Sequence, residues 1–551
     1  MGAILNEILS GRRAFKGDSN AETLCAILEK NPTPLDSLGV DVPPRLAGII
    51  TRCLEKQPTL RLQSATELIS AIQSSLHSAN ASNVAEKSIA VLPFANLGSS
   101  TDQEYFGDGL AEELINAFAQ LSGLRVASRS SAFRFRGSDL DIRDIGKQLN
   151  VETVLEGSVR RVGKSLRVTV QLVDATTGYH LWSHRYDREL ADVFVIQDEI
   201  TQSVLQKLAL KLLGQTPKAN RHHSENPEAF AFYLKGRHLW YQRTEPALRA
   251  GIQCFMKAIE LDPEYALAHA GLADSFSILR PWGYVTTDEA RDRTRAAAKK
   301  AIELDPTLAE AQFSMAVYRY WLTDDWPTAE PYFERAVELQ PNSSIFWGYY
   351  GHFLSSRHRF REALTCTEKA LRIDPMSAFV LSIASRTNYV ARQDERALEL
   401  AEQALSVQPD FAQGLFALGL VSCRLGQYDQ SINCFNRLVS ITDRSAMAVG
   451  MLGSTYALAG QTTEAELLLN ELRRRSSHLY VDPVCEALIY FGLGDLNNFE
   501  LQLKALIEQH GAHANVENLL GPYLDSLANQ PQFHTLFQEL CLSSRSLNSG
   551  S

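Results

Sequence analysis

A six-residue pattern recurs through the second half of the chain at a nearly constant interval. It consists of alanine, an aliphatic residue, any residue, an aliphatic residue, any residue and proline. Its copies are Ala258–Pro263, Ala301–Pro306, Ala336–Pro341, Ala370–Pro375 and Ala404–Pro409. The closing prolines lie 43, 35, 34 and 34 residues apart, and a weaker copy closes at Asp443. The interval of 43 contains an insertion around Pro281–Thr287. A fixed period of this length indicates one supersecondary unit that is stacked many times.

Small residues stand at fixed offsets within this period. Alanine occupies the positions 12 and five residues before Pro341, Pro375 and Pro409. Small residues also precede the closing position by 24 residues, at Gly351, Ser385 and Gly419. We expect two helices to cross closely at these places. Proline lacks an N–H group and blocks continuation of the second helix, so it separates one unit from the next.

These features resemble the tetratricopeptide (TPR) repeat, a pair of antiparallel helices in 34 residues. The resemblance covers residues 226–540, about eight helix pairs, of which the last two are degenerate. It implies an all-α solenoid with a concave groove. In that groove the first helix of each pair meets a protein or peptide partner.

The segment 88–214 loses the helical period. Short strand-like runs, such as Ser88–Phe94 and Ser165–Val173, alternate with helical stretches and predict an α/β domain with a mixed sheet. The phrases SIAVLPFANL, EYFGDGLAEELI, VLEGSVRR and QLVDATTGYHLWSHRYDREL resemble the TolB-like N-terminal domain of multidomain bacterial proteins. That resemblance implies an assembly or regulatory module and brings no catalytic residue.

Residues 1–76 resemble the last part of a bacterial Ser/Thr kinase C-lobe, from αF to αI. The helices implied are Ala3–Leu9, Ala21–Leu28, Pro44–Leu54 and Ser64–Ser74, and Arg61 matches the arginine that pairs with the A-P-E glutamate. The Gly-rich loop, the strand lysine, H-R-D and D-F-G are absent from the chain, so we expect no kinase activity. Either the gene start is miscalled, or the piece is a retained structural cap.

Composition narrows the function further. The formal net charge of −10 disfavours nucleic acid as a partner. None of the eight cysteines forms a CxxC, and no motif implies a metal or cofactor, so we expect none. No stretch of about 18 apolar residues occurs, which predicts a cytoplasmic protein without a membrane span. Residues 77–87 and 215–225 are expected to be linkers, and 541–551 a disordered tail.

The first helices of the repeats carry the candidate partner-binding residues. Aromatic residues and arginine contribute most to binding energy at interfaces. When the repeats are aligned on their closing positions, seven residues, mostly aromatic, are predicted to face the groove: Tyr318, Trp321, His352, Phe379, Arg386, Tyr389 and Phe416. Each could instead fill the core between repeats. No Lys/Asn set appears at the inward offsets, which disfavours capture of a peptide's carboxylate end.

The sequence therefore predicts a multidomain chain, with an all-α TPR solenoid preceded by an α/β (TolB-like) domain and a kinase C-lobe remnant. The expected function is a non-catalytic interaction protein of a bacterial signalling assembly, and self-association is a further expectation. The alternative is the regulatory C-terminal portion of a receptor-like Ser/Thr kinase whose catalytic half is missing from this chain.

Overall fold

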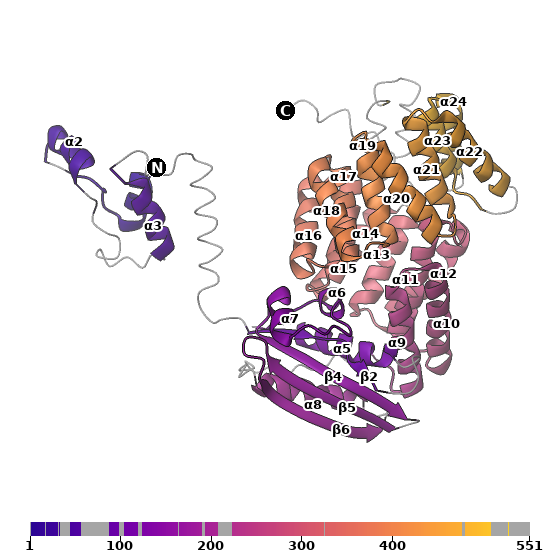
Figure 1. Ribbon diagram of the computed structural model, residues 1–551, viewed down its shortest axis with the longest axis horizontal. Coiled ribbons are helices and arrows are strands. Elements are labelled where there is room, and N and C mark those ends of the chain that lie inside the picture. Colours follow the sequence, from indigo (N-terminus) through magenta and orange to yellow (C-terminus); the bar gives the residue numbers. More distant parts are fainter. Residues whose placement is uncertain are drawn as a thin grey trace. The chain divides into compact units, whose positions relative to one another are not determined.

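The computed structural model describes most of the chain. The described residues are 2–16, 18–30, 32, 44–56, 87–97, 104–119, 124–162, 165–189, 193–207, 223–323, 325–476, 480–508 and 527. They belong to two compact units, Met1–Glu86 and Lys87–Ser551 (Figure 1). The helix predicted at Ser64–Ser74, Arg61, most of both linkers and the tail 541–551 lie outside the described residues.

The first unit contains α1 (Gly2–Ser10), α2 (Asn20–Glu29) and α3 (Pro44–Cys53). Ser19 begins α2, because its hydroxyl accepts a hydrogen bond from the backbone N–H of Glu22 at 3.2 Å. The Lys56 ammonium donates to the Ile27 carbonyl at 2.8 Å and joins the segment after α3 to α2. Helices thus occupy three of the four ranges expected in this unit.

The second unit starts with a mixed sheet. Its strands lie in the order β3-β1-β4-β5-β6, and a short β2 also pairs with β4. β1 runs parallel to β3 and β4, whereas β4, β5 and β6 are antiparallel neighbours. The strands are β1 (Lys87–Val91), β2 (Ala95–Asn96), β3 (Leu124–Val126), β4 (Thr153–Val162), β5 (Ser165–Asp174) and β6 (His180–Glu189). The predicted mixed α/β architecture is confirmed.

One long helix supplies much of the sheet's apolar cover. Phe106, Leu110, Leu114 and Phe118 recur every four residues on α5 (Glu104–Ala119) and are buried with strand residues such as Val168. The other helices here are α6 (Arg129–Phe133), α7 (Ile142–Leu149) and α8 (Val193–Lys207). The five-residue α6 was not predicted, since so short a helix leaves no periodic signal.

The repeat array consists of eight successive helix pairs among residues 227–508. The helices are α9 (Pro227–Tyr241), α10 (Glu245–Leu261), α11 (Ala266–Leu279), α12 (Thr287–Leu304), α13 (Ala309–Trp321), α14 (Trp326–Leu339), α15 (Ser344–Ser356), α16 (Phe360–Ile373), α17 (Ala378–Val390), α18 (Asp394–Val407), α19 (Ala412–Arg424), α20 (Tyr428–Ile441), α21 (Ala446–Leu458), α22 (Thr462–Ser476), α23 (Pro483–Leu493) and α24 (Leu496–Glu508). A 3₁₀ turn, η5 (Arg280–Trp282), lies between α11 and α12.

The small residues mark helix crossings, as the period predicts. A Cβ added to Gly419 would lie 2.6 Å from the Phe435 ring of the paired helix, which is closer than atoms can approach. At the equivalent position the Ser385 hydroxyl donates to the Ala397 carbonyl of the next helix at 2.7 Å. A side chain larger than serine would force these pairs apart, so small residues permit the packing distance.

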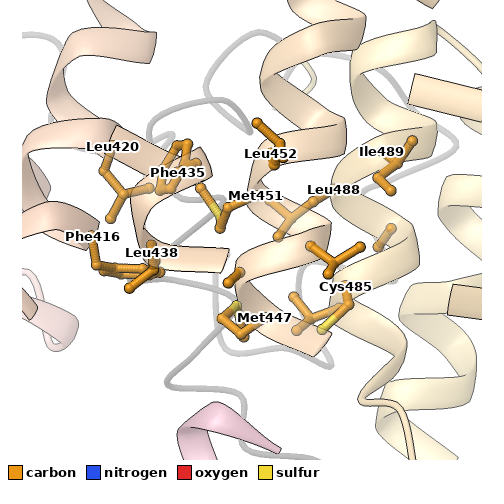
Figure 2. Packing of buried hydrophobic residues seen from close by; sticks show 14 of the residues in the cluster. Phe416, Leu420, Phe435, Leu438, Met447, Met451, Leu452, Cys485, Leu488 and Ile489 are labelled. Atoms are coloured by element: carbon orange, nitrogen blue, oxygen red, sulfur yellow. The ribbon is translucent and has the colours of Figure 1, made fainter. Parts of the chain in front are cut away.

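The residues of the core continue from one pair to the next. Figure 2 shows Phe416 of α19 beside Leu438 of α20, and Met447 of α21 between them and Cys485 of α23. All four are less than one-tenth exposed. Each pair therefore buries its apolar face against its neighbours, which is how a solenoid is stabilised.

The sheet domain packs against the first repeat. Glu112 of α5 is mostly buried there, with its side chain 12% exposed, 3.0 Å from the Arg129 Nε and 3.2 Å from an Arg237 Nη of α9. The Tyr241 hydroxyl donates to the same carboxylate at 2.9 Å. Burial disfavours ionisation of Glu112, but the two guanidinium groups outweigh it and lower its pKa. The sheet domain and the repeats thus share a charged, hydrogen-bonded contact. None of the helices in the described parts of the chain is long and apolar enough to cross a membrane.

Candidate partner-binding site

A hollow lies on the face formed by the first helices of the repeats. Its volume is about 80 Å³, and it is partly open to solvent. Its walls come from six helices, α11, α13, α15, α17, α19 and α21, and from η5. Arg243, the residue after the Gln242 cap of α9, also contributes. The lining residues are Arg243, Ile278, Pro281, Trp282, Trp321, Tyr349, Phe379, Ser382, Ile383, Arg386, Gln413, Phe416 and Met447. We call this the concave pocket.

The insertion in the first repeat interval forms one wall of the concave pocket. Trp282 of η5 packs edge-on against Phe416 of α19, with ring centroids 5.9 Å apart. Its neighbour Arg280 is buried and pairs with Asp482, which caps α23, at 3.1 Å. The Tyr284 hydroxyl donates to the Thr442 carbonyl at 3.3 Å. The insertion therefore connects the second repeat to the last ones across the concave face.

Arg243 provides one positive charge in the wall. It is only 8% exposed, and its guanidinium lies 3.7 Å from the Trp240 ring centroid and 4.8 Å from that of Phe379. Burial lowers its pKa, whereas a hydrogen bond with Tyr349 opposes that change. An arginine keeps its charge at neutral pH even so. The charge is held among aromatic rings, which attract it through their faces.

Arg386 of α17 provides a second positive charge. One Nη atom lies 3.2 Å from the Nε2 of His352, and the guanidinium lies 5.5 Å from the Phe416 ring centroid. Because a guanidinium can only donate, His352 Nε2 accepts this bond and its proton sits on Nδ1. Burial and the adjacent Arg386 hold the pKa of His352 well below its usual value. His352 is thus a neutral support for Arg386.

Three residues of the wall have buried polar atoms without a protein partner. Arg386 Nε and Trp321 Nε1 are donors, and Gln413 Oε1 is an acceptor. Most buried polar atoms in folded proteins are hydrogen-bonded, and leaving one unsatisfied costs about 1–3 kcal/mol. Their occurrence together around one hollow indicates a surface that can bind a polar ligand group.

Four of the seven predicted groove residues line the concave pocket. They are Trp321, Phe379, Arg386 and Phe416, from α13, α17 and α19. His352 does not line it but lies behind Arg386, fully buried. The period therefore brings four of the seven residues to one hollow, while the depth of each side chain depends on its neighbours.

Two of the seven need correction. Tyr389 is fully buried in the core, and Arg424 of the next repeat donates to its carbonyl at 3.0 Å. Tyr318 is 6% exposed and packs in a cluster with Met315 and Leu322. Both fill the space between neighbouring repeats, because an array must bury apolar surface there as well as within each pair.

Sequence reasoning missed Arg243, Trp282, Tyr349, Gln413 and Met447, which also line the concave pocket. One signal for Trp282 was present in the sequence. The interval between Pro263 and Pro306 is nine residues longer than the period of 34, and insertions in a regular array form loops, often on the binding face. No sequence feature indicates that this loop reaches α19 and α23.

Metal ligands and reactive thiols are two kinds of catalytic group that can be examined in the described residues. Among them, no group of three histidine, cysteine or acidic side chains is arranged to hold a metal ion. Burial is the main cause that raises the pKa of the Cys366 and Cys434 thiols to about 11. A thiol with so high a pKa is a poor nucleophile at neutral pH.

Comparison with known families identifies a relative for the sheet domain. Residues 85–203 match the family model described as the second domain of HilA/YgeH-like transcriptional regulators. This match extends over β1 to most of α8, and so nearly coincides with the α/β part of the structure.

Two curated relatives resemble longer parts of the chain. A protein named putative adenylate cyclase 3, from Rhizobium meliloti, is 34% identical over 241 residues, which are 43% of this chain and 41% of that protein. Transcriptional regulator HilA of Salmonella typhimurium is 22% identical over 297 residues, 53% of this chain and 51% of HilA. The chain thus spans about half or less of these relatives' lengths.

Solved structures resemble the repeats at low identity. The Cut9–Hcn1 hetero-tetramer of the APC/C is 15% identical, with a TM-score of 0.40, over 63% of this chain and 59% of that one. YrrB, described as a TPR protein with an unusual peptide-binding site, is 20% identical, with a TM-score of 0.24, over 32% and 90%. This chain thus carries an array of stacked helix pairs with a 34-residue period, similar to TPR repeats, and a domain similar to the second domain of HilA/YgeH-like regulators.

Proposed function

We propose that this protein is a non-catalytic interaction protein of a bacterial signalling assembly, which binds a partner through the concave face of its repeats. TPR proteins are generally protein-interaction scaffolds. The observation that carries the proposal is the concave pocket, where Trp321, Phe379 and Arg386 present partly exposed aromatic and cationic groups. Residues of these types dominate binding energy at interfaces.

The sheet domain is proposed to be the TolB-like module of this assembly, over residues 88–214. The match of residues 85–203 to a domain of transcriptional regulators supports a regulatory role, since that domain is not itself described as an enzyme. The two relatives carry the names of different output activities, a cyclase and a transcriptional regulator. Because the similar region occurs in proteins with different named activities, we expect it to have an input or assembly function. Its contact with the repeats through Glu112 would transmit a change in either part to the other.

A capture experiment tests the proposal. Immobilised full-length protein and its Phe379→Ala variant are compared for retained proteins, and one retained protein is purified for calorimetry. We expect the variant to bind that protein at least about tenfold more weakly, because Phe379 is a partly exposed ring of the concave pocket. The matched control is Tyr332→Ala, a partly exposed aromatic residue of the second helix α14. Equal affinity of both variants and the wild type would refute the proposal.

The second candidate is the regulatory C-terminal portion of a receptor-like Ser/Thr kinase. It is favoured by the kinase-like sequence of residues 1–76 and by helices α1, α2 and α3 in the expected ranges. The DNA upstream of Met1 separates the candidates. In-frame codons for H-R-D and D-F-G would favour the kinase, and their absence would favour the interaction protein.

A further inference from the structure

We propose that the concave pocket binds a small organic anion, a carboxylate carried on an aromatic or aliphatic body. The inference rests on the proposed function in one respect, because both use the concave face. The inference differs from the proposed function in the ligand, which is a small molecule instead of a protein. Four features of the pocket support a small organic anion: its charge, its unsatisfied donors, its apolar walls and the insertion.

The charge of the pocket is positive and has no acidic partner in the wall. Arg243 and Arg386 line it, and no aspartate or glutamate is among the lining residues. Within the described residues neither guanidinium forms an ion pair, although Asp274 is near enough to act on Arg243 electrostatically. Burying an unpaired charge is costly, so a bound anion would stabilise both arginines.

The unsatisfied donors specify a ligand with acceptor oxygens. Arg386 Nε and Trp321 Nε1 each carry a buried hydrogen without a protein acceptor. A carboxylate has two oxygens and only accepts, and its bonds to arginine are charge-assisted and therefore strong. Gln413 can present its amide N–H₂ after a flip of the side chain, since the oxygen and nitrogen of an amide are assigned by their hydrogen bonds.

The remaining wall is apolar and suits the body of the ligand. Phe379, Phe416, Tyr349, Ile278 and Met447 surround the hollow. The hollow has a volume of about 80 Å³ and is partly open to solvent, so it takes a compact carboxylate whose body can extend to the opening. An inorganic anion would leave these apolar surfaces in contact with water, so the body contributes to affinity.

The insertion limits the inside of the concave pocket to a compact ligand, while the partly exposed Trp321 and Phe379 stay available to a protein partner. Pro281 and Trp282 form part of the wall, and the Arg280–Asp482 ion pair fixes their loop to α23. An extended chain that followed the first helices along the array would meet this loop. A compact ligand in the pocket would instead contact residues of α13, α17 and α19 together.

Calorimetry on the full chain tests the inference with named probes. Phenylacetate, benzoate and hexanoate are titrated in parallel with neutral phenylacetamide and with inorganic phosphate. We expect at least one carboxylate to bind, and phenylacetamide and phosphate to bind at least tenfold more weakly. If no carboxylate binds, or if phenylacetamide or phosphate binds as tightly, the inference is overturned.

Variants locate the binding. Arg386→Gln should weaken the best carboxylate at least tenfold, whereas Arg396→Gln should change its affinity less than twofold. Arg396 is the matched control, an arginine of the adjacent α18 that pairs with Glu399 at 2.7 Å outside the pocket. Trp321→Phe keeps an aromatic ring, removes the indole N–H and should weaken the carboxylate as well. Unchanged binding in both Arg386→Gln and Trp321→Phe would place the ligand elsewhere and overturn the inference.

The thermal stability of the Arg386→Gln variant is a second measurement, which distinguishes a ligand-binding role of Arg386 from a structural one. The thermal midpoint of unliganded Arg386→Gln should stay close to that of the wild type, because removal of a buried unpaired charge offsets the lost bond to His352. A lower midpoint together with wild-type probe affinity would show that Arg386 is structural. The partner-capture comparison remains separate. Capture without carboxylate binding refutes only this inference, and carboxylate binding without capture refutes only the proposed interaction function.

Discussion

The Arg280 guanidinium lies 3.1 Å from the Asp482 carboxylate, although 202 residues separate them in the chain. Their side chains are 3% and 11% exposed. This ion pair joins the insertion after α11 to the start of α23, so it connects the second helix pair to the eighth. Contacts in a solenoid otherwise run between neighbours, and this one therefore adds cooperativity between distant repeats.

Asp482→Asn should strongly destabilise the protein. Asparagine can still cap α23 through its side-chain oxygen, as Asp482 does by accepting from Val484 N–H, so the change mainly removes the charge. The buried Arg280 then lacks a counter-ion, which costs about 3–5 kcal/mol. Urea denaturation measures the change. Asp410→Asn is the control, since its pair with Arg437 is exposed and should contribute less than about 1 kcal/mol. Equal losses in both variants would contradict a structural role of the buried pair.

Gly419→Ala should destabilise the array although alanine favours helices. The new methyl group would lie 2.6 Å from the Phe435 ring, and overpacking of this kind costs about 1–3 kcal/mol. Gly348→Ala is the matched control in α15. There the nearest atom is a methyl of Ile383 at 3.0 Å, which can shift. Thermal unfolding should show a clear decrease for Gly419→Ala and a smaller effect for Gly348→Ala. The reverse order would mean that Gly419 does not mark a close crossing.

The repeats were predictable because their signal is local. Ala336, Ala370 and Ala404 accept the helix-ending bonds from Gln340, Asp374 and Gln408, at 3.0, 2.9 and 3.0 Å. The next residue after each donor is a proline, which ends the helix. All of these contacts join residues within one period, so the sequence pattern contains their signal.

The candidate site was only partly predictable because its geometry is not local. Arg386 and Tyr389 lie one turn apart on α17, and helical spacing assigns them to one face. The structure separates them, since Arg386 lines the concave pocket while Tyr389 packs into the next repeat. Trp282 reaches Phe416 only through the curvature of the whole array, which is the sum of small rotations from repeat to repeat.

A protein beginning at Lys87 should keep the main unfolding transition of the full chain. The structure divides the chain between Glu86 and Lys87, and the core of the sheet domain is continuous with that of the first repeat. Circular dichroism melts of residues 87–551 should therefore give an unchanged midpoint.

A protein beginning at Asn226 is the comparison for this deletion. It would expose Phe230 and Leu234 of α9, which are buried in the cluster shared with α5. Each is expected to lose part of the roughly 1.5–3 kcal/mol that full burial provides. The thermal unfolding midpoint of the protein that begins at Asn226 should therefore be lower than that of the full chain. If deletion of residues 1–86 lowered the midpoint as much, the division at Lys87 would be wrong.

Asp274 should make stability depend on pH between about 4 and 6. It is buried on α11 and accepts a hydrogen bond from the Ser314 hydroxyl at 2.6 Å. Burial is the main cause that raises its pKa to about 6, against the opposing effects of Ser314, Arg237 and Arg243. The unfolded chain has an aspartate pKa of about 3.9. The folded protein therefore binds an additional proton in this window, and its free energy of unfolding falls as pH rises.

Asp274→Asn removes this titration. At about 1.36 kcal/mol per pKa unit, the difference in stability between wild type and variant should change by about 3 kcal/mol from pH 4 to pH 7, with the wild type losing stability relative to the variant. Urea denaturation at several pH values measures it. Ser314→Ala removes a bond that lowers the pKa, so its window should shift to higher pH. A wild-type minus Asp274→Asn difference that is constant with pH would show that Asp274 titrates as an ordinary surface carboxylate.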